Sequence, residues 1–301
     1  MAGAIRIVTD SSAQFIDPTL VQRYNIVVVP LEICLDGTVY REDIDLSGES
    51  FFQRLSRATE LPTLHPPPVE HLAAVYRRLG QETDRVLSIH LSRAMHNTCQ
   101  VARRATESML GRMRIEVLDS QSIAIGLGLL VEAAARLAEQ TDSLDTVVRN
   151  IRKLIPHIYS IFNVEALEYL GWNDLMAESQ VILGNMLGIR PFLTIEEGEL
   201  IAMEKTRTRL QAVDKLVEFA TEFAAVDQLV ILQGSLTPTE QARQLQERLA
   251  VDYPDRVFPI LMYKPSLACF LGPGAIGLMI FEHDLVDFEE DAPFDEGEDD
   301  R

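Results

Sequence analysis

The sequence predicts a two-domain α/β protein, with an N-terminal parallel-sheet α/β domain over residues 1–157 and a C-terminal α+β domain over residues 158–283. In the first half, short apolar runs alternate with helix-like stretches, a rhythm typical of parallel strands joined by helices that cover both faces of a sheet. In the second half, a hairpin pattern breaks this alternation. Residues 284–301 carry ten acidic residues, one basic residue and few large apolar ones, which predicts a disordered acidic tail.

The elements of the first half follow from apolar runs that are bounded by turn or cap residues. Strands are expected at Ala4–Thr9, Asn25–Pro30, Arg85–His90 and Arg114–Leu118, with a hairpin of Glu32–Leu35 and Thr38–Tyr40 around the turn Asp36-Gly37. Helices are expected from Ser47, over Val69–Gly80 and Cys99–Leu110, from the cap Asp119–Ser122 to Gln140, and over Ser143–Ile155. Four prolines in Leu61–Pro68 exclude a helix or a central strand there.

The second half mixes helices with antiparallel strands. Helices are expected over Val164–Leu170, Ala177–Leu187, Thr206–Ala224 and Thr237–Leu249. Strands are expected at Arg190–Ile195, Leu200–Glu204, Gln228–Gln233, Val257–Met262 and Ala275–Phe281, the first two as a hairpin around Glu196-Glu197-Gly198.

Composition excludes several classes of protein. The net charge is −19, which disfavours binding to nucleic acid or to an anionic membrane. Three widely spaced cysteines allow neither a disulfide framework nor a CxxC zinc site and favour a reducing compartment. The start of the chain lacks a signal-peptide layout, and no apolar run approaches the roughly 18 residues of a membrane span. We therefore expect a cytoplasmic protein that does not span a membrane.

The motifs of well-known enzyme families are absent or misplaced. Gly272 to Gly277 match G-x-G-x-x-G, but only 24 residues follow and Pro273 removes one phosphate-facing N–H, so a tight turn is the better interpretation. P-loop, H-E-x-x-H and G-x-S-x-G motifs are missing, and no two histidines stand four residues apart on a helix. The sequence thus predicts no cofactor, no metal and no catalytic residue.

Polar residues collect in two loops that could hold a ligand. One is the loop Ser92–Thr98, which includes Asn97 and follows a predicted parallel strand, where α/β proteins bind ligands. The helix N-terminus after it suits an anionic head group. The other is Thr63-Leu64-His65 in the proline-rich segment. The alternative is that Asn97 or Thr98 merely caps the following helix.

In order and spacing these features resemble the DegV family of bacterial lipid-binding proteins, from Ile5 to about Phe281. The resemblance rests on the following residues: Thr9-Asp10-Ser11-Ser12-Ala13, Val28-Val29-Pro30-Leu31, Gly37, Tyr40, Thr63, Pro66, Asp119-Ser120, Leu183-Gly184, Arg190-Pro191, Lys205, Arg207, Arg209 and Gly272-Pro273-Gly274 with Gly277. It implies a protein without catalytic activity that binds a long-chain fatty acid or other acyl lipid in a buried tunnel. It also implies a carboxylate site near the domain junction and, in some members, presentation of the acyl chain to an ATP-dependent fatty acid kinase subunit.

The chain departs from the family pattern at the expected head-group positions. The family's usual arginine is Leu175 here, and its usual histidine is Phe270. The neighbouring loops instead acquire His65, Arg93 and His96. A buried carboxylate without a partner is costly, so either the cationic partner has moved or the ligand is no longer a free carboxylate.

We therefore predict a lipid-binding site whose polar end consists of Thr63, Arg93 or His96, and Thr98. Its other members are His65, Ser92, Asn97, Leu175 and Phe270. Lys205, Arg207 and Arg209, three cations in an acidic chain, are predicted to bind a kinase partner, with ordinary solvation of a helix start as the alternative. A solvent-facing Arg93 is the alternative at the polar end.

Other functions stay open at this stage. The protein could be a divergent member that binds a neutral lipid, or an interaction or regulatory protein with a degenerate pocket. An enzyme that uses Asp10, Ser11 and Asp119 is less favoured, because no histidine lies near them in the sequence.

Overall fold

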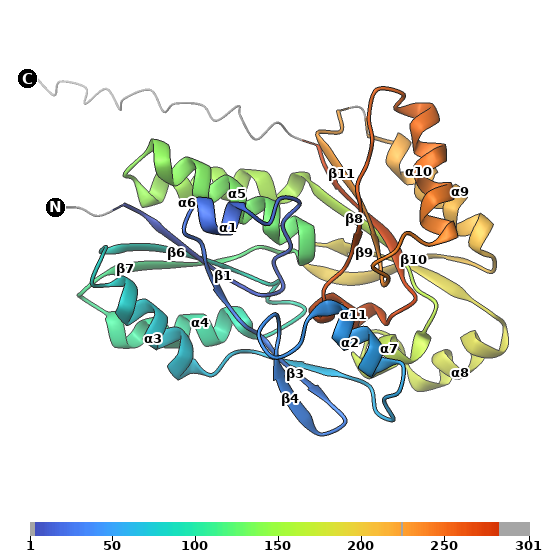
Figure 1. Cartoon of the computed structure of the whole chain (residues 1–301), viewed down its shortest axis with the longest axis horizontal. Coiled ribbons are helices and arrows are strands. Elements are labelled where there is room, and N and C mark those ends of the chain that lie inside the picture. Colours follow the sequence, from blue (N-terminus) through green and yellow to red (C-terminus); the bar gives the residue numbers. More distant parts are fainter. Residues whose placement is uncertain (1–3, 224, 283–301) are drawn as a thin grey trace, which may run out of the picture.

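In the computed structural model, which describes residues 4–223 and 225–282, the chain forms two main sheets and a small third sheet. The parallel sheet and the larger second sheet lie at opposite ends of the long axis, and the small sheet lies below both (Figure 1). This arrangement confirms the predicted fold class. The boundary at residue 157 stays a prediction, and the predicted acidic tail lies outside the described residues.

The first sheet has four parallel strands in the order β2-β1-β6-β7. Successive side chains alternate between its two faces, so Val8 and Val86 share a buried cluster with α3 and α4, whereas Ile7 and Leu87 face α5 and α6. The elements of this part are β1 (Arg6–Asp10), α1 (Leu20–Arg23), β2 (Val27–Val29), α3 (Val69–Leu79), β6 (Arg85–His90), α4 (Thr98–Thr106), β7 (Arg114–Asp119), α5 (Ala124–Gln140), α6 (Leu144–Leu154) and short 3-10 helices at Glu107–Met109 and Ile155–His157.

The small antiparallel sheet has the order β4-β3-β5 and carries the predicted hairpin. Asp36 and Gly37 both have positive φ, as a two-residue hairpin turn of right-handed strand twist requires. The elements are β3 (Glu32–Leu35), β4 (Thr38–Arg41), α2 (Gly48–Leu55) and β5 (Thr63–His65). The proline-rich segment therefore contains an edge strand, the one kind of strand that prolines tolerate.

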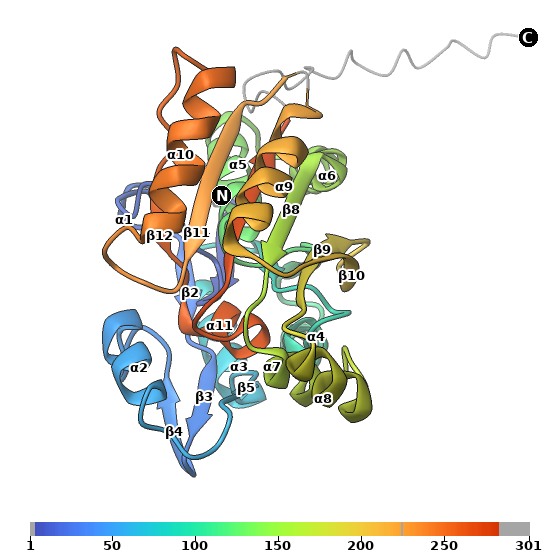
Figure 2. The same ribbon diagram turned by 90° about the vertical axis from the view of Figure 1, so that its right-hand side faces the viewer.

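The second sheet has six strands in the order β10-β9-β8-β13-β11-β12, and all neighbours are antiparallel except β11 and β12. On β13, Leu278 and Ile280 belong to the apolar cluster of α9 and α10, whereas Met279 and Phe281 belong to the cluster that includes the first domain. Helices α9 and α10 lie on one face of the second sheet (Figure 2). The elements are β8 (Ile158–Asn163), α7 (Leu167–Trp172), α8 (Glu178–Met186), β9 (Arg190–Glu196), β10 (Glu199–Thr206), α9 (Arg209–Thr221), β11 (Gln228–Gln233), α10 (Glu240–Asp252), β12 (Ile260–Met262), α11 (Pro265–Leu271) and β13 (Ile276–Phe281).

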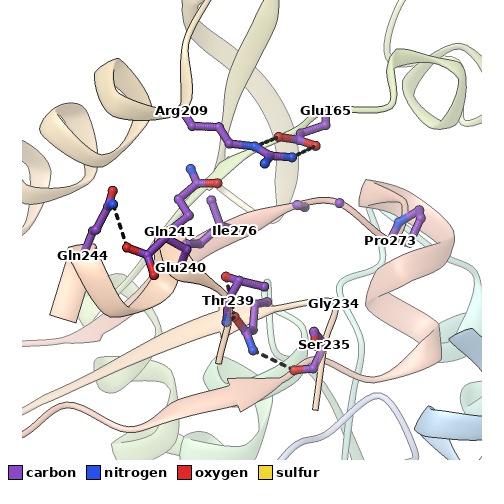
Figure 3. Close-up of a pocket in the computed structure, with 13 residues that line it drawn as sticks. Glu165, Arg209, Gly234, Ser235, Thr239, Glu240, Gln241, Gln244, Pro273 and Ile276 are labelled. Atoms are coloured by element: carbon purple, nitrogen blue, oxygen red, sulfur yellow. Dashed lines mark hydrogen bonds and ion pairs between the residues drawn. The ribbon is translucent and has the colours of Figure 1, made fainter. Parts of the chain in front are cut away.

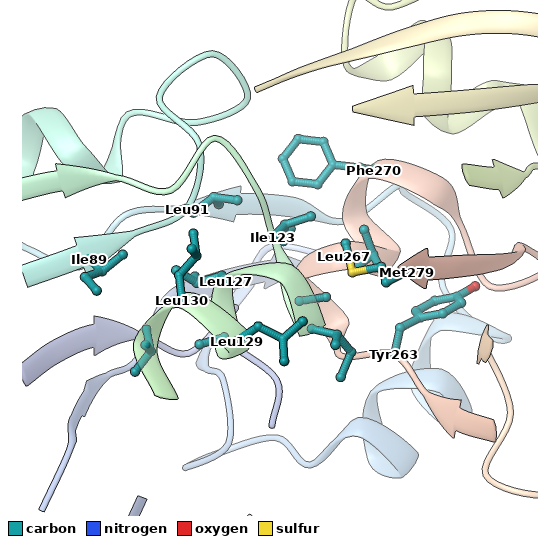
Figure 4. Close-up of a cluster of buried hydrophobic side chains, with 14 of the residues drawn as sticks. Ile89, Leu91, Ile123, Leu127, Leu129, Leu130, Tyr263, Leu267, Phe270 and Met279 are labelled. Atoms are coloured by element: carbon teal, nitrogen blue, oxygen red, sulfur yellow. The ribbon is translucent and has the colours of Figure 1, made fainter. Parts of the chain in front are cut away.

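Helix α5 lies between the two main sheets and contacts both. It is buried on nearly all sides, because apolar and small residues surround its whole circumference. At Gly128 a Cβ atom would stand 2.0 Å from the carbonyl oxygen of Gln14, so only glycine allows this approach of loop and helix. One continuous apolar core thus extends from the parallel sheet through α5 to the second sheet (Figure 4).

Four elements were not predicted: α1, β5, β8 and α11. Strand β8 follows a 3-10 helix directly, with no loop between the two. Helix α9 begins at Arg209 rather than at Thr206, because the Thr208 side chain caps it by accepting from the N–H of Gln211. Among the described residues, no helix is both long and apolar enough to cross a bilayer.

Candidate functional site

The loop between β6 and α4 meets β5 through His96. Its ring Nε2 lies 3.2 Å from the carbonyl oxygen of Leu64, and its Nδ1 lies 2.7 Å from the hydroxyl of Thr98. Burial lowers the pKa of His96, which favours the neutral ring near neutral pH. Because a carbonyl oxygen only accepts, Nε2–H donates to Leu64, and the Thr98 hydroxyl donates to Nδ1. The structure therefore joins the two predicted polar loops, with the Thr98 proton committed to His96.

The other polar group on β5 is a pair formed by Thr63 and His65. Two residues apart, they lie on the same face of the strand, and the Thr63 hydroxyl is 3.0 Å from His65 Nε2. Thr63 is half-buried and His65 exposed. Helix α11 packs against β5, so this pair lies beside the helix that carries Phe270.

Of the two predicted head-group positions, both apolar here, Phe270 lies on α11 and Leu175 lies in a turn beside it. Phe270 is buried in the core near Leu91 and Ile123 (Figure 4). Leu175 is partly exposed in the turn after α7. The side-chain amide of Asn173 donates to the carbonyl of Cys269 at 2.9 Å, which holds that turn against α11. These positions present apolar side chains around the same helix.

Arg93 has a different partner from the one expected. Its guanidinium lies 3.2 Å from Asp119 at the end of β7, and its backbone N–H donates to the same carboxylate at 3.1 Å. The side chain is 67% exposed. Arg93 therefore lies at the surface beside Asp119, rather than turned toward Thr63 and His96 with its charge unpaired.

The remaining members of the loop have structural partners. The Ser92 hydroxyl donates to the carbonyl of Gly198 at 2.7 Å, which ties the loop to the β9–β10 turn of the second sheet. Asn97 is exposed at the start of α4, and its side chain makes no capping hydrogen bond. Asn97 thus occupies the N-cap position of α4 but does not cap the helix through its side chain.

A buried polar chain that the sequence did not reveal runs beneath this loop. The hydroxyls of Tyr76 and Ser88 are 2.8 Å apart, Ser88 is 2.8 Å from His90 Nε2, and His90 Nδ1 is 3.0 Å from Asp10. All four side chains have no exposed surface. Ser88 and His90 stand two residues apart on β6, which places both side chains on the same face of the strand. This spacing is the one feature of the sequence that could have indicated the polar chain.

Burial alone would raise the pKa of Asp10, but hydrogen bonds and charge from His90 outweigh it. Further hydrogen bonds from Ser12 and from the N–H of Leu91 add to this effect, and the pKa of Asp10 is lowered. The order of groups is that of a hydrolytic Asp-His-Ser triad. Because Ser88 is completely buried, its hydroxyl has no access to a substrate in this structure.

The three residues of the enzyme alternative do not form one site. Asp10 pairs with His90, the Ser11 hydroxyl donates to Glu42 at 2.5 Å, and Asp119 pairs with Arg93. Among residues 4–223 and 225–282, no group of His, Cys, Asp and Glu side chains is arranged to hold a metal ion. The motif at Gly272 forms the turn after α11, with a φ of +75°.

The predicted partner-binding cations lie where β10 leads into α9. Lys205 and Arg207 are exposed. Arg209 pairs with Glu165 through two contacts of 3.0 and 3.2 Å (Figure 3). Arg190 holds the same carboxylate at 2.6 Å. Arg209 and Glu165 border a cavity of about 380 Å³ beside the start of α10. Arg209 is thus held by Glu165, whereas the structure gives no contact of Lys205 or Arg207 with that carboxylate.

Comparison with known proteins gives a consistent result. The family model described as "Uncharacterised protein, DegV family" matches residues 4–283. A DegV domain-containing protein of Caldanaerobacter subterraneus is 34% identical over 215 residues, which cover 71% of this chain and 76% of that protein.

Solved structures agree with the sequence match. A DegV family protein from Thermus thermophilus, reported for its fatty acid binding, is 27% identical, with a TM-score of 0.80 over 93% of this chain and 100% of that one. DegV of Bacillus subtilis, reported as a fatty acid binding protein, is 27% identical, with a TM-score of 0.79 over the same shares.

Proposed function

Because the chain belongs to the DegV family, we propose that it binds a long-chain fatty acid or a related acyl lipid and catalyses no reaction on it. The observation that carries the proposal is the full-length likeness to two structures reported for fatty acid binding, each 27% identical to this chain. The complete burial of Ser88 and the separate partners of Asp10, Ser11 and Asp119 support a binding role.

The acyl chain would occupy the apolar interior between the two sheets. Side chains from α5, α11 and β13 converge there, including Ile123, Leu127, Leu267 and Met279 (Figure 4). Apolar walls that close around a ligand, with a few polar groups at one end, are the usual form of such sites. We propose that Phe270 and these side chains move apart to admit the chain.

The polar end would consist of Thr63, His65, His96 and Thr98, with Ser92 and Asn97 in the supporting loop. The first N–H groups of α4 have no intrahelical partner and point toward this end of the loop, where they favour a partial or full negative charge. Arg93 would lie outside this polar end, paired with Asp119 at the surface.

A neutral head group is the second candidate, and a specific observation favours it. Leu175 and Phe270 are apolar, His96 is held in its neutral form, and Arg93 already pairs with Asp119. A carboxylate at this place would lack the charged partner that normally offsets its desolvation. An alcohol, an ester or a protonated acid would require only hydrogen bonds.

Native mass spectrometry of the full-length protein, purified from its expression host, tests the proposal. We expect the bound mass of one acyl lipid, whose identity by extraction decides between fatty acid and neutral lipid. No bound lipid, together with no thermal stabilisation by palmitic acid, stearic acid or hexadecanol, would contradict lipid binding. That result would favour an interaction or regulatory protein with a degenerate pocket.

Two substitutions locate the polar end. His96→Ala should weaken the binding of the lipid found by extraction by about tenfold, since it breaks the link between Thr98 and Leu64. Arg93→Ala is the matched control on the same loop and should change binding less than about twofold, because Arg93 pairs with Asp119 at the surface. If Arg93→Ala weakened lipid binding more than His96→Ala, Arg93 would contact the ligand and the proposed polar end would be wrong.

We also propose that Lys205 and Arg207 take part in docking an ATP-dependent fatty acid kinase subunit. Reversal of both to Glu should slow association without altering lipid content, since exposed charges at an interface act mainly on the association rate. Arg209→Glu is unsuitable as a primary test, because it would also break the contact with Glu165. Unchanged association of the double variant would refute the docking surface.

A further inference from the structure

A second cavity lies on the opposite side of β1 from the buried polar chain. It has a volume of about 370 Å³ and lies between the loop after β1, the end of β2, the loop after β4 and the start of α11. Its walls are mostly apolar and include Phe15, Val21, Val28, Pro30 and Ile44. This volume falls within the ordinary range for small-molecule sites.

One end of the cavity is polar and is built around Lys264. The ammonium group donates to the carbonyl oxygen of Ser11 at 2.9 Å and to the carboxylate of Asp43 at 2.7 Å. The charge of Lys264 is therefore offset by Asp43 within the same end of the cavity.

Two further acceptor groups line the same cavity. Glu42 has no exposed surface, and its carboxyl group accepts from the hydroxyl of Ser11 and from the N–H of Ser266. Within the described part of the chain, no cationic side chain is hydrogen-bonded to it. Gln14 donates through Nε2 to the carbonyl of Met262, and its Oε1 is buried without a partner in the described part of the chain. A buried acceptor without a donor is unfavourable, so the site lacks a donor at this place.

The charges and acceptors together define the ligand. With Glu42 ionised, Lys264, Asp43 and Glu42 sum to one negative charge, and Gln14 adds a free acceptor. We propose that this cavity is a second ligand site, for a compact amphiphile that has a primary-amine head group and an aliphatic or aromatic body. A carboxylate head would face Glu42 and Asp43 and is disfavoured by like charge.

The titration of Glu42 supports the same ligand class. Burial raises the pKa of Glu42 to about 7, opposed in part by the charge of Lys264, while Asp43 raises it further. Cys269 also lies near Glu42, and burial raises the pKa of that thiol well above its ordinary value, so it is neutral. An ammonium group that binds here would favour the ionised form of Glu42, so binding below about pH 7 should release a proton.

Three probes with matched tails test the site: octylamine, octanol and octanoate, titrated into the isotopically labelled full-length protein at about pH 8. We expect octylamine to shift the methyl resonances of Val21, Val28 and Ile44 and to bind about tenfold more tightly than octanoate. Octanoate binding as tightly as octylamine, as judged from these methyl groups, would overturn the proposal. So would the absence of shifts with octylamine.

Variants at the rim separate the head-group contact from general hydrophobic binding. Asp43→Asn should weaken octylamine severalfold and leave octanol unchanged. Ile44→Lys, at an exposed rim position, should repel octylamine in the same way. Asp45→Asn is the matched control, since Asp45 lies two residues from Asp43 and pairs with Arg41. Equal affinity for octylamine in Asp43→Asn and Asp45→Asn would refute the amine-binding role.

Discussion

Glu42 is a buried carboxyl group whose protonation should control the stability of the fold. It lies between the Ser11 hydroxyl at 2.5 Å and the Ser266 N–H at 2.8 Å, and so joins β1, the small sheet and α11. Burial raises its pKa from an ordinary value of 4.5 to about 7, although the charge of Lys264 works in the opposite direction. The folded protein therefore retains a proton at Glu42 in a pH range where the unfolded chain releases it.

The sign and size of the effect follow from this difference. Between pH 4.5 and about 7 the native state binds more protons at this site than the unfolded state, so its contribution to stability falls as pH rises. Each unit of pKa difference corresponds to about 1.4 kcal/mol, which gives a total loss of about 3 kcal/mol. Below pH 4.5 the contribution is fully present, and above about pH 7 it has been lost.

The substitution Glu42→Gln isolates this contribution, because glutamine has the shape of the protonated acid. Urea unfolding of both proteins between about pH 4 and pH 8 should show that the variant gains about 3 kcal/mol relative to wild type across the window. Glu49→Gln, on the exposed side of α2, is the control and should give a flat difference. A flat difference for Glu42→Gln would refute the reasoning, since it would mean that folding does not raise the pKa of Glu42.

Two further substitutions test contacts that hold the loop between β6 and α4. His90→Asn should destabilise the protein by about 3–5 kcal/mol in urea unfolding, because Asp10 would be left buried without its partner; a loss below about 1 kcal/mol would show that Asp10 is not ionised there. Gly198→Ala should cost about 1–3 kcal/mol, because its φ is +89° and the new Cβ would stand 2.5 Å from the Ser92 hydroxyl. Gly111→Ala is the control, with a φ of +75° and no atom within 4 Å of the new Cβ, and an equal loss in both variants would mean that the Ser92 contact is unimportant.

Most helices and strands could be predicted from the sequence, because hydrophobic runs and capping residues indicate where they begin and end. The strands β6 and β11 have the predicted bounds, since each is a short apolar run between a helix and a loop. Strand β8 was missed although it lies in the middle of the second sheet. Its neighbours β9 and β13 pair with it from positions far along the chain, and no loop separates it from the 3-10 helix before it.

The candidate site residues could be predicted from the sequence only where the ends of strands bring loops together. The rule that ligands bind beyond the carboxyl ends of parallel strands directed attention to the loop containing His96, and the structure joins that loop to β5. The partners of Glu42 and His90 could not be predicted, because Ser266 and Asp10 reach them from distant segments. The pairing of Arg93 with Asp119 depends on the register of β6 against β7, in which His90 stands opposite Asp119.

The altered head-group positions and the state of His96 point to the same chemistry at the polar end. If the ligand carried a full negative charge, the loss of cationic partners at Leu175 and Phe270 would require a new one. The nearest introduced cation, Arg93, is 67% exposed and bonded to Asp119. His96 is held neutral by burial and donates to the Leu64 carbonyl rather than toward an anion. We therefore propose that the polar end forms hydrogen bonds rather than ion pairs, and we expect it to favour an acyl ligand whose head group is uncharged when bound.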